Sequence, residues 1–376
     1  MNNSDDFICN VLIMGKTGTG KSTLLNYLCD KKIADTGTGK PVTGEGIYEY
    51  KVNINNQEVR LFDSWGIEAG KTERWKQLIA EALKEHGVQK SMEDWFHCVI
   101  YCIQAGGGRV EDIDSEIIQR FLKDGYHLTI ILTKADQVAE DDEAKMKEVI
   151  LKEISGAVKA EKRGLLKVVA TCAEQKKTRS GETNPFGKEE AIATIFEGWK
   201  ETIIDRMPKH VIGRICELIY EWAAEWKQTI RASKNISGIE SENKVLYQTL
   251  AENAKESIQI IQQEALPDIL KESVESCRKA STSLKNTFDV PIDDSLFDAE
   301  ILYNTESLIT TVLKGALKGA FILPLFVDFF RRHSEDNITT QKTGLCNFVD
   351  DLATRIKLEI EKNENQVAKI IEKALS

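Results

Sequence analysis

The sequence lacks three features that would assign it to a large class at once: an excess of positive charge, a paired-cysteine motif and a long apolar run. Its 50 lysine and arginine residues are outnumbered by 60 aspartate and glutamate residues, so the net charge is −10. Surfaces that bind nucleic-acid phosphates are normally basic, and we therefore expect no nucleic acid as a main partner. The eight cysteines form no C-x-x-C pair and show no regular spacing, which predicts reduced and mostly buried thiols.

The stretch that comes nearest to a membrane span, residues 308–330, is interrupted by lysines, an aspartate and a proline. Its longest uncharged run, residues 319–327, is far shorter than the ~20 residues that cross a bilayer. Two interpretations stay open: a buried helix of a helical domain, or a segment that inserts at a membrane interface. The N-terminus is polar and acidic, unlike a secretory signal. We therefore expect a cytoplasmic protein, with peripheral membrane contact through residues 308–330 under the second interpretation.

A glycine-rich loop lies near the start of the chain, between an apolar run of strand length and a segment with helical spacing. Residues 15–22 read G-K-T-G-T-G-K-S and fit the phosphate-binding pattern G-x-x-x-x-G-K-[ST]. The backbone N–H groups of such a loop, and the positive end of the helix that follows, bind phosphates. The pattern places Lys21 on the β- and γ-phosphates and Ser22 on Mg²⁺. The predicted phosphate contacts are Gly15, Thr17, Gly18, Thr19, Gly20, Lys21, Ser22 and Thr23.

The loop of residues 31–46 is rich in glycine, threonine and lysine and has no hydrophobic periodicity. In nucleotide switches this position holds a threonine that binds Mg²⁺ and senses the γ-phosphate. Thr36, Thr38 and Thr43 are the candidates, and we favour Thr43, with a catalytic role, because it lies closest to the next strand. The alternative is an ordinary solvated loop.

Two alternating segments, residues 47–54 and 58–62, predict a hairpin that ends in the D-x-x-G sequence of residues 63–66. At the tip of a strand in this position, Asp63 is expected to hold Mg²⁺ through water. The Gly66 N–H is expected to meet the γ-phosphate. Alone the motif is weak, but its place after a phosphate loop and a hairpin makes it informative.

The base is predicted by a tetrapeptide that follows the buried strand of residues 128–132. Thr133, Lys134 and Asp136 match the guanine motif [NT]-K-x-D, in which the aspartate accepts hydrogen bonds from N1 and N2 of guanine. Adenine has no such donors, so it would leave the carboxylate unpaired at a cost. An ATPase would require this match to be accidental. After a further strand, Cys172 and Ala173 lie where a backbone N–H contacts guanine O6, and which of them aligns stays open.

Together these motifs resemble the G domain of the translation-factor-related GTPases over residues 8–198. The sequence of residues 15–26, G-K-T-G-T-G-K-S-T-L-L-N, is similar to the phosphate loops of the Era-like and immunity-associated GTPases. The resemblance implies an α/β P-loop domain with a mostly parallel six-stranded sheet, one antiparallel strand and helices on both faces. It also implies GTP or GDP with Mg²⁺ as ligands, and a homodimer through the G domain.

Two departures from relatives concern hydrolysis. Small Ras-like GTPases carry a glutamine just after the D-x-x-G glycine, where it orients the attacking water. This chain has Ile67 there, and Gly18 replaces the asparagine of potassium-dependent relatives. We therefore expect slow hydrolysis unless a dimer partner or another protein completes the site. Arg109 is a candidate for a finger-like charge, although an ordinary solvated arginine is the more common case.

From about residue 186 onward, strand patterns and prolines become scarce and amphipathic helices follow one another. We predict a GTP-binding domain over residues 1–198 and a helical effector or assembly domain over residues 199–376. The leading hypothesis is a GTP-hydrolysing switch that acts through these helices. The alternatives are a GTP-binding scaffold with negligible turnover and a dynamin-like GTPase that associates with membranes.

Overall fold

The computed structural model describes residues 8–34, 45–55, 57–68, 70–107, 110–156, 166–178, 181–232 and 338–366, with short pieces between 268 and 279 and at 368–369. The chain divides into two compact units. The first contains the described residues up to Arg206 together with Ser276 and Lys279, and the second begins at Met207. This division lies inside the helix that begins at Trp199. The predicted domain boundary, between residues 198 and 199, lies just before that helix. That boundary stays a prediction.

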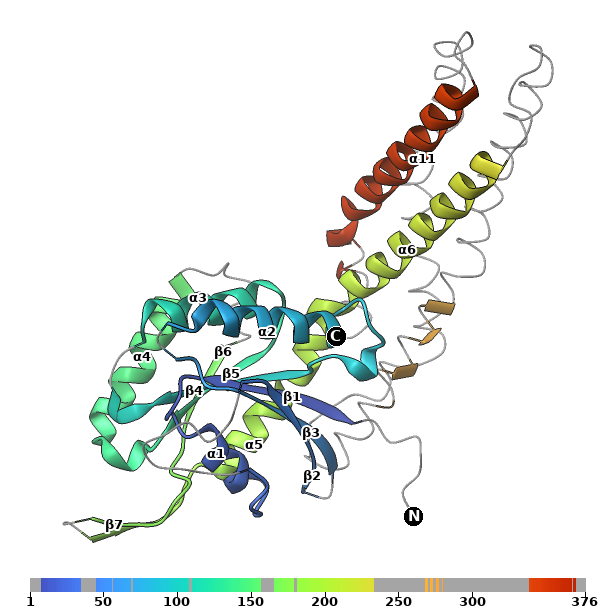
Figure 1. Ribbon diagram of the computed structural model, residues 1–376. Helices are drawn as coiled ribbons and strands as arrows, with labels where there is room; N and C mark the ends of the chain where they lie inside the picture. Colours follow the sequence, from blue (N-terminus) through green and yellow to red (C-terminus); the bar gives the residue numbers. More distant parts are fainter. Residues whose placement is uncertain are drawn as a thin grey trace. The chain divides into compact units, whose positions relative to one another are not determined.

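The first unit is built on a six-stranded sheet with the strand order β2-β3-β1-β4-β5-β6 (Figure 1). Only β2 runs antiparallel, to its neighbour β3, and the other neighbouring strands are parallel. This confirms the expected α/β fold with one antiparallel strand. The strands are β1 (Cys9–Gly15), β2 (Ile47–Ile54), β3 (Gln57–Ser64), β4 (Cys98–Gln104), β5 (Leu128–Thr133) and β6 (Leu166–Ala170).

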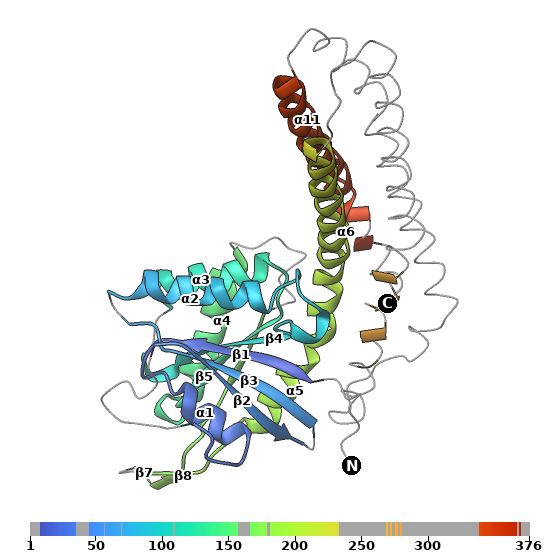
Figure 2. The same ribbon diagram turned by 45° about the vertical axis from the view of Figure 1, so that its right-hand side comes forward.

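Helices cover both faces of this sheet. Figures 1 and 2 show α2 (Thr72–Glu85), α3 (Asp112–Lys123) and α4 (Glu140–Gly156) over one face. The other face is covered by α1 (Lys21–Leu28) and α5 (Lys188–Glu197). The central strands β1, β4 and β5 are therefore buried on both sides, which explains their continuous apolar runs.

Short elements complete the first unit. The 3-10 turns are η1 (Met92–Asp94), η2 (Ala105–Gly107) and η3 (Ala135–Gln137). A small hairpin of β7 (Lys176–Thr178) and β8 (Gly181–Thr183) follows β6 and the loop of residues 171–175. Residues 95–97, which directly precede β4, are buried as well. The Asn10 side chain of β1 donates to Trp95 O at 2.8 Å, and His97 N donates to Asn10 O at 2.9 Å.

The long helix α6 (Trp199–Ala232) enters the second unit, where it packs against α11 (Ile338–Glu361). Lys227 Nζ lies 2.5 Å from Asp350 Oδ1, and Lys342 Nζ donates to Arg231 O at 3.0 Å, so the two helices run antiparallel. Their facing sides are apolar, as expected for amphipathic helices. The buried residues on these sides include Ile215, Ile219, Trp222, Leu345, Val349, Leu352 and Ile356.

Among the described helices, none has the length and apolar character needed to cross a membrane. Residues 308–330, for which we kept a buried helix and a membrane-inserting segment as alternatives, lie outside the described residues.

Candidate nucleotide-binding site

The phosphate loop joins the end of β1 to the start of α1. Its glycines are required by the backbone: Gly18 and Gly20 have φ values of 83° and 90°, in the left-handed region that other residues rarely adopt. A Cβ on Gly15 would lie 2.5 Å from Cys102 O in the neighbouring strand β4. The pattern therefore reflects a close approach at Gly15 and a backbone requirement at Gly20, whereas Gly18, which the pattern leaves open, has only the backbone requirement.

Lys21 lies inside this loop and is buried. Its ammonium donates to Gly15 O at 3.1 Å and to Lys16 O at 2.9 Å. Burial lowers the pKa of Lys21, and the nearby Cys102 and Asp63 act in the opposite direction. Two backbone carbonyls of the phosphate loop thus fix the Lys21 ammonium beside the residues that the motif assigns to phosphate binding.

Asp63 and Ser22 meet beside Lys21. Ser22 Oγ donates to Asp63 Oδ2 at 3.3 Å, and Asp63 is only 1% exposed. Burial raises the pKa of Asp63 to about 6, although Lys21 and the Ser22 hydroxyl lower it in part. The second carboxylate oxygen, Oδ1, is buried and has no hydrogen-bond donor among the described residues. A hydroxyl and an unsatisfied carboxylate oxygen are hard ligands of the kind that Mg²⁺ takes, so these two residues fit the ion.

The segment after Asp63 is fastened to the phosphate loop by backbone bonds. Thr17 N donates to Ile67 O at 3.1 Å, and Ile67 N donates to Gly15 O at 3.2 Å. A Cβ on Gly66 would lie 2.5 Å from Thr17 Oγ1, so this position also needs glycine. The Ile67 side chain is 6% exposed and belongs to the hydrophobic core. Thr43 and Arg109, the other predicted participants on this side, lie outside the described residues.

The guanine motif contacts the phosphate loop from the other side. Thr133 Oγ1 donates a short hydrogen bond to Thr19 O. Lys134 has a left-handed backbone (φ 53°), and its Nζ donates to Gly18 O at 2.9 Å and to Gln104 Oε1 at 3.0 Å. The motif and the phosphate loop are therefore one connected structure, although more than 100 residues separate them in sequence.

A pocket opens between these elements. Its lining combines three predicted segments: the end of the phosphate loop, the guanine motif and the loop after β6. The lining residues are Gly20, Thr23, Leu24, Thr133, Lys134, Asp136, Thr171, Cys172, Ala173 and Glu174. The structure thus brings Asp136 together with both Cys172 and Ala173. Sequence analysis missed Leu24, Thr171 and Glu174, which are direct neighbours of predicted residues, and Gln104, a polar residue at the end of the buried strand β4.

Residues 10–134 match the family described as "50S ribosome-binding GTPase". Cell division control protein 11 of Saccharomyces cerevisiae is 21% identical over 169 residues, which cover 38% of this chain and 40% of the relative. The tRNA modification GTPase MnmE of Ureaplasma parvum is 31% identical over 138 residues, which cover 36% of this chain and 28% of the relative. The chain therefore matches less than half the length of these relatives.

Similar solved structures include Toc33 from Arabidopsis thaliana in complex with Mg²⁺ and GMPPNP. It is 19% identical, has a TM-score of 0.37, and the match covers 46% of this chain and 74% of that one. Era in complex with MgGDPNP and 16S ribosomal RNA nucleotides is 22% identical with a TM-score of 0.35, over 45% of this chain and 52% of that one. The family match and the sequence relatives agree with the ordered motifs of the site. The N-terminal part of this chain has the P-loop GTPase fold, and residues 10–134 are similar in sequence to GTPase domains of the translation-factor-related class.

Proposed function

We propose that the chain is a Mg²⁺-dependent, GTP-hydrolysing switch whose G domain acts through its C-terminal helices. The proposal rests on one observation: three groups of residues with different chemistry lie around the same phosphate loop. Lys21, the Ser22–Asp63 pair and the Asp136 pocket all adjoin the phosphate loop. A phosphate, a metal and a guanine base therefore each have suitable residues beside one another.

The roles of the residues follow from their chemistry. Lys21 would turn its ammonium from the Gly15 and Lys16 carbonyls to the β- and γ-phosphates and stabilise the charge that develops there. Mg²⁺, when bound, would supply further positive charge to stabilise the phosphate oxygens. Ser22 and Asp63 would hold the ion, Asp63 through water, with Thr43 as the proposed third ligand. Gly66 would offer its N–H to the γ-phosphate.

A switch also needs segments whose positions depend on the nucleotide. The backbone bonds between Ile67 and the phosphate loop join the D-x-x-G segment directly to the part of the chain that binds phosphate. We propose that GTP orders this segment and the loop around Thr43, and that hydrolysis releases both. The helical residues 199–376 would carry the output, as dimerisation, partner binding or membrane association.

The base assignment has a direct test. Asp136→Asn replaces a double acceptor with a side chain that also donates, so it should weaken GTP binding and favour xanthosine triphosphate. Competition of both nucleotides against a fluorescent GDP measures this preference. Lys145, which is exposed and ion-paired within α4, offers a control in Lys145→Gln. If Asp136→Asn keeps the original preference for GTP, the guanine assignment is wrong.

A GTP-binding scaffold with negligible turnover is the second candidate, and Ile67 favours it. Its buried, apolar side chain cannot orient a water molecule. Phosphate release across a series of protein concentrations separates the two candidates. A rate per molecule that rises with concentration supports an enzyme completed by a second copy, whereas a flat rate near zero supports the scaffold.

Peripheral membrane contact through residues 308–330 is a further part of this proposal. Flotation of the full chain with liposomes, with and without a non-hydrolysable GTP analogue, tests it. Flotation that depends on the analogue supports a dynamin-like mode of action. Its absence under both conditions favours the alternative of a buried helix.

A further inference from the structure

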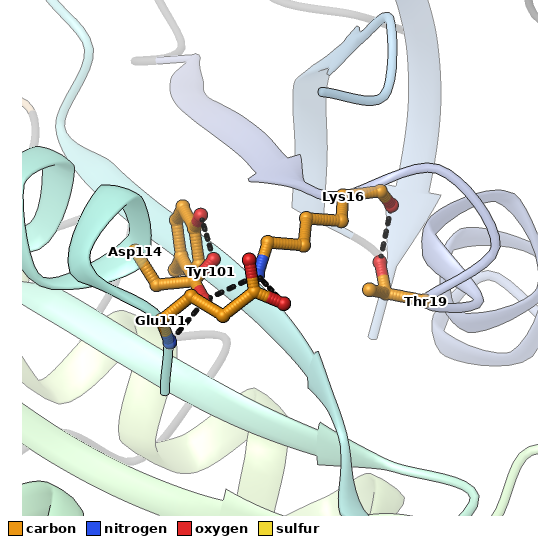
Figure 3. Close-up of polar contacts among 5 residues, drawn as sticks. All are labelled: Lys16, Thr19, Tyr101, Glu111 and Asp114. Carbon is orange, nitrogen blue, oxygen red and sulfur yellow. Dashed lines mark hydrogen bonds and ion pairs between the residues drawn. The ribbon is translucent and has the colours of Figure 1, made fainter. Parts of the chain in front are cut away.

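Lys16 belongs to the phosphate loop, but its side chain leaves the loop and runs toward α3 (Figure 3). Its Nζ lies 2.7 Å from Asp114 Oδ2 and 2.9 Å from Glu111 Oε1. These acidic residues form the start of α3, where each side chain caps the backbone near the other. Lys16 therefore ties the phosphate loop to a helix that begins almost 100 residues later in the chain.

Asp114 is a buried carboxylate whose hydrogen bonds are satisfied. It is 2% exposed, and Tyr101 OH donates to its Oδ1 at 2.6 Å. Its Oδ2 accepts from Glu111 N at 2.9 Å as well as from Lys16. Bonds to a buried charge are stronger than ordinary ones and are costly to break. The two acidic residues raise the pKa of Lys16 even though burial lowers it, so the lysine stays charged.

The backbone of Lys16 is equally constrained. Its carbonyl accepts from Lys21 Nζ at 2.9 Å and from Thr19 Oγ1 at 2.8 Å. On either side of it, Gly15 O and Thr17 N are both bonded to Ile67. The residue whose side chain is anchored to α3 is thus the one whose carbonyl holds the phosphate-binding lysine.

We propose that Lys16, Asp114 and Tyr101 are positioning residues that hold the first turn of the phosphate loop in the shape required for phosphate binding. The inference rests on the proposed guanine-nucleotide function and adds residues to it whose identity no motif specifies. Asp114 and Tyr101 do not line the base pocket, and the Lys16 side chain points away from it. Their loss should therefore weaken the hold on phosphates and leave the choice of base unchanged.

The test uses the full chain and fluorescent GDP. The main variant is Lys16→Met/Asp114→Asn. It removes both charges of the Lys16–Asp114 ion pair, so neither of these two positions keeps a charge without its partner. Lys16→Arg keeps the positive charge at this position and should bind fluorescent GDP as the unmodified chain does. The matched control is Lys76→Met/Glu116→Gln, because this pair joins α2 to the same helix α3 at 2.8 Å but is exposed. Tyr101→Phe removes a single bond to Asp114 and keeps the test decisive if the double variant does not fold.

We expect the double variant to release GDP about tenfold faster than the unmodified chain and the control, with a smaller effect for Tyr101→Phe. The ratio of GDP to inosine diphosphate affinity should match that of the control. Unchanged GDP release in the double variant, or in Tyr101→Phe if only that variant folds, would overturn the inference. A base ratio that changes together with the affinity would do so too. If the unmodified chain does not bind GDP, the proposed function itself fails, so the two failures are distinct.

Discussion

His97 offers a quantitative test of the core beneath the site. Its ring is fully buried, Nδ1 accepts from Asn10 N at 3.0 Å, and Nε2 contacts Met92 O at 2.9 Å. Since Nδ1 accepts a backbone N–H, the proton of the neutral ring is on Nε2, which donates to Met92. Burial lowers the pKa of His97 to about 3, the Met92 carbonyl and Glu93 oppose this, and Arg206 and Arg60 add to it.

The sign of the pH effect follows from this lowering. In the unfolded chain His97 has the ordinary histidine pKa of 6.5. Below that pH it therefore binds a proton in the unfolded chain but not in the folded chain. The free energy of unfolding therefore falls as the pH falls from 6.5 toward 3. The slope approaches about 1.4 kcal/mol per pH unit, and the loss between pH 7.5 and 5.0 amounts to about 2 kcal/mol.

The variant His97→Asn removes this titration and keeps an oxygen that can accept from Asn10 N–H. We expect it to be less stable at pH 7.5, since one hydrogen bond is lost, by about 1–2 kcal/mol. It should then lose about 2 kcal/mol less than the unmodified chain on acidification to pH 5.0. Urea unfolding at both pH values measures the difference. His86→Asn, at a partly exposed ring, serves as control, and an equal acid loss in His97→Asn and the unmodified chain would refute the argument.

Further predictions concern close contacts and the metal site. Gly198→Ala should destabilise the chain by about 2 kcal/mol or more in thermal unfolding, because a Cβ there would lie 1.6 Å from His127 Nδ1. Gly66→Ala should weaken binding of a non-hydrolysable GTP analogue about tenfold more than binding of GDP in titrations, because its Cβ would clash with Thr17 and displace the segment that we propose meets the γ-phosphate. Asp63→Asn should raise the unfolding temperature in EDTA, because a buried charge is removed, and abolish the effect of Mg²⁺ on GDP release.

The parts of the fold that sequence predicted are those in which a local pattern and the tertiary environment agree. The apolar runs before Gly15 and Thr133 form β1 and β5, since both faces of a parallel sheet are buried and period-two alternation is not needed. The motifs then begin where these strands end, and parallel strands deliver their carboxyl ends to one edge. The pocket around Asp136 follows from this topology more than from any single residue.

The features that sequence missed depend on contacts between distant residues. Lys16 and Asp114 are 98 residues apart, and a lysine in a phosphate loop carries no sign that its partner lies on α3. The pairing exists because β4, which leads to α3, lies directly beside β1. The hairpin of β7 and β8 was missed for another reason: its three-residue strands are polar and too short to show a pattern.

Ile67 shows how the structure changes an interpretation made from sequence. The pattern indicated only that a catalytic glutamine is missing, but the structure places this side chain in the core and uses its backbone to fasten the phosphate loop. Ile67→Gln would therefore bury an amide, at a cost of about 1–3 kcal/mol, without bringing it to a water molecule. We expect the variant to unfold at a lower temperature with no faster phosphate release. Ile67→Val, which stays apolar, separates the effect of size from that of polarity. Faster hydrolysis by Ile67→Gln at unchanged stability would contradict this expectation. It would show that the side chain can leave the core and that the backbone bonds between Ile67 and the phosphate loop open during turnover.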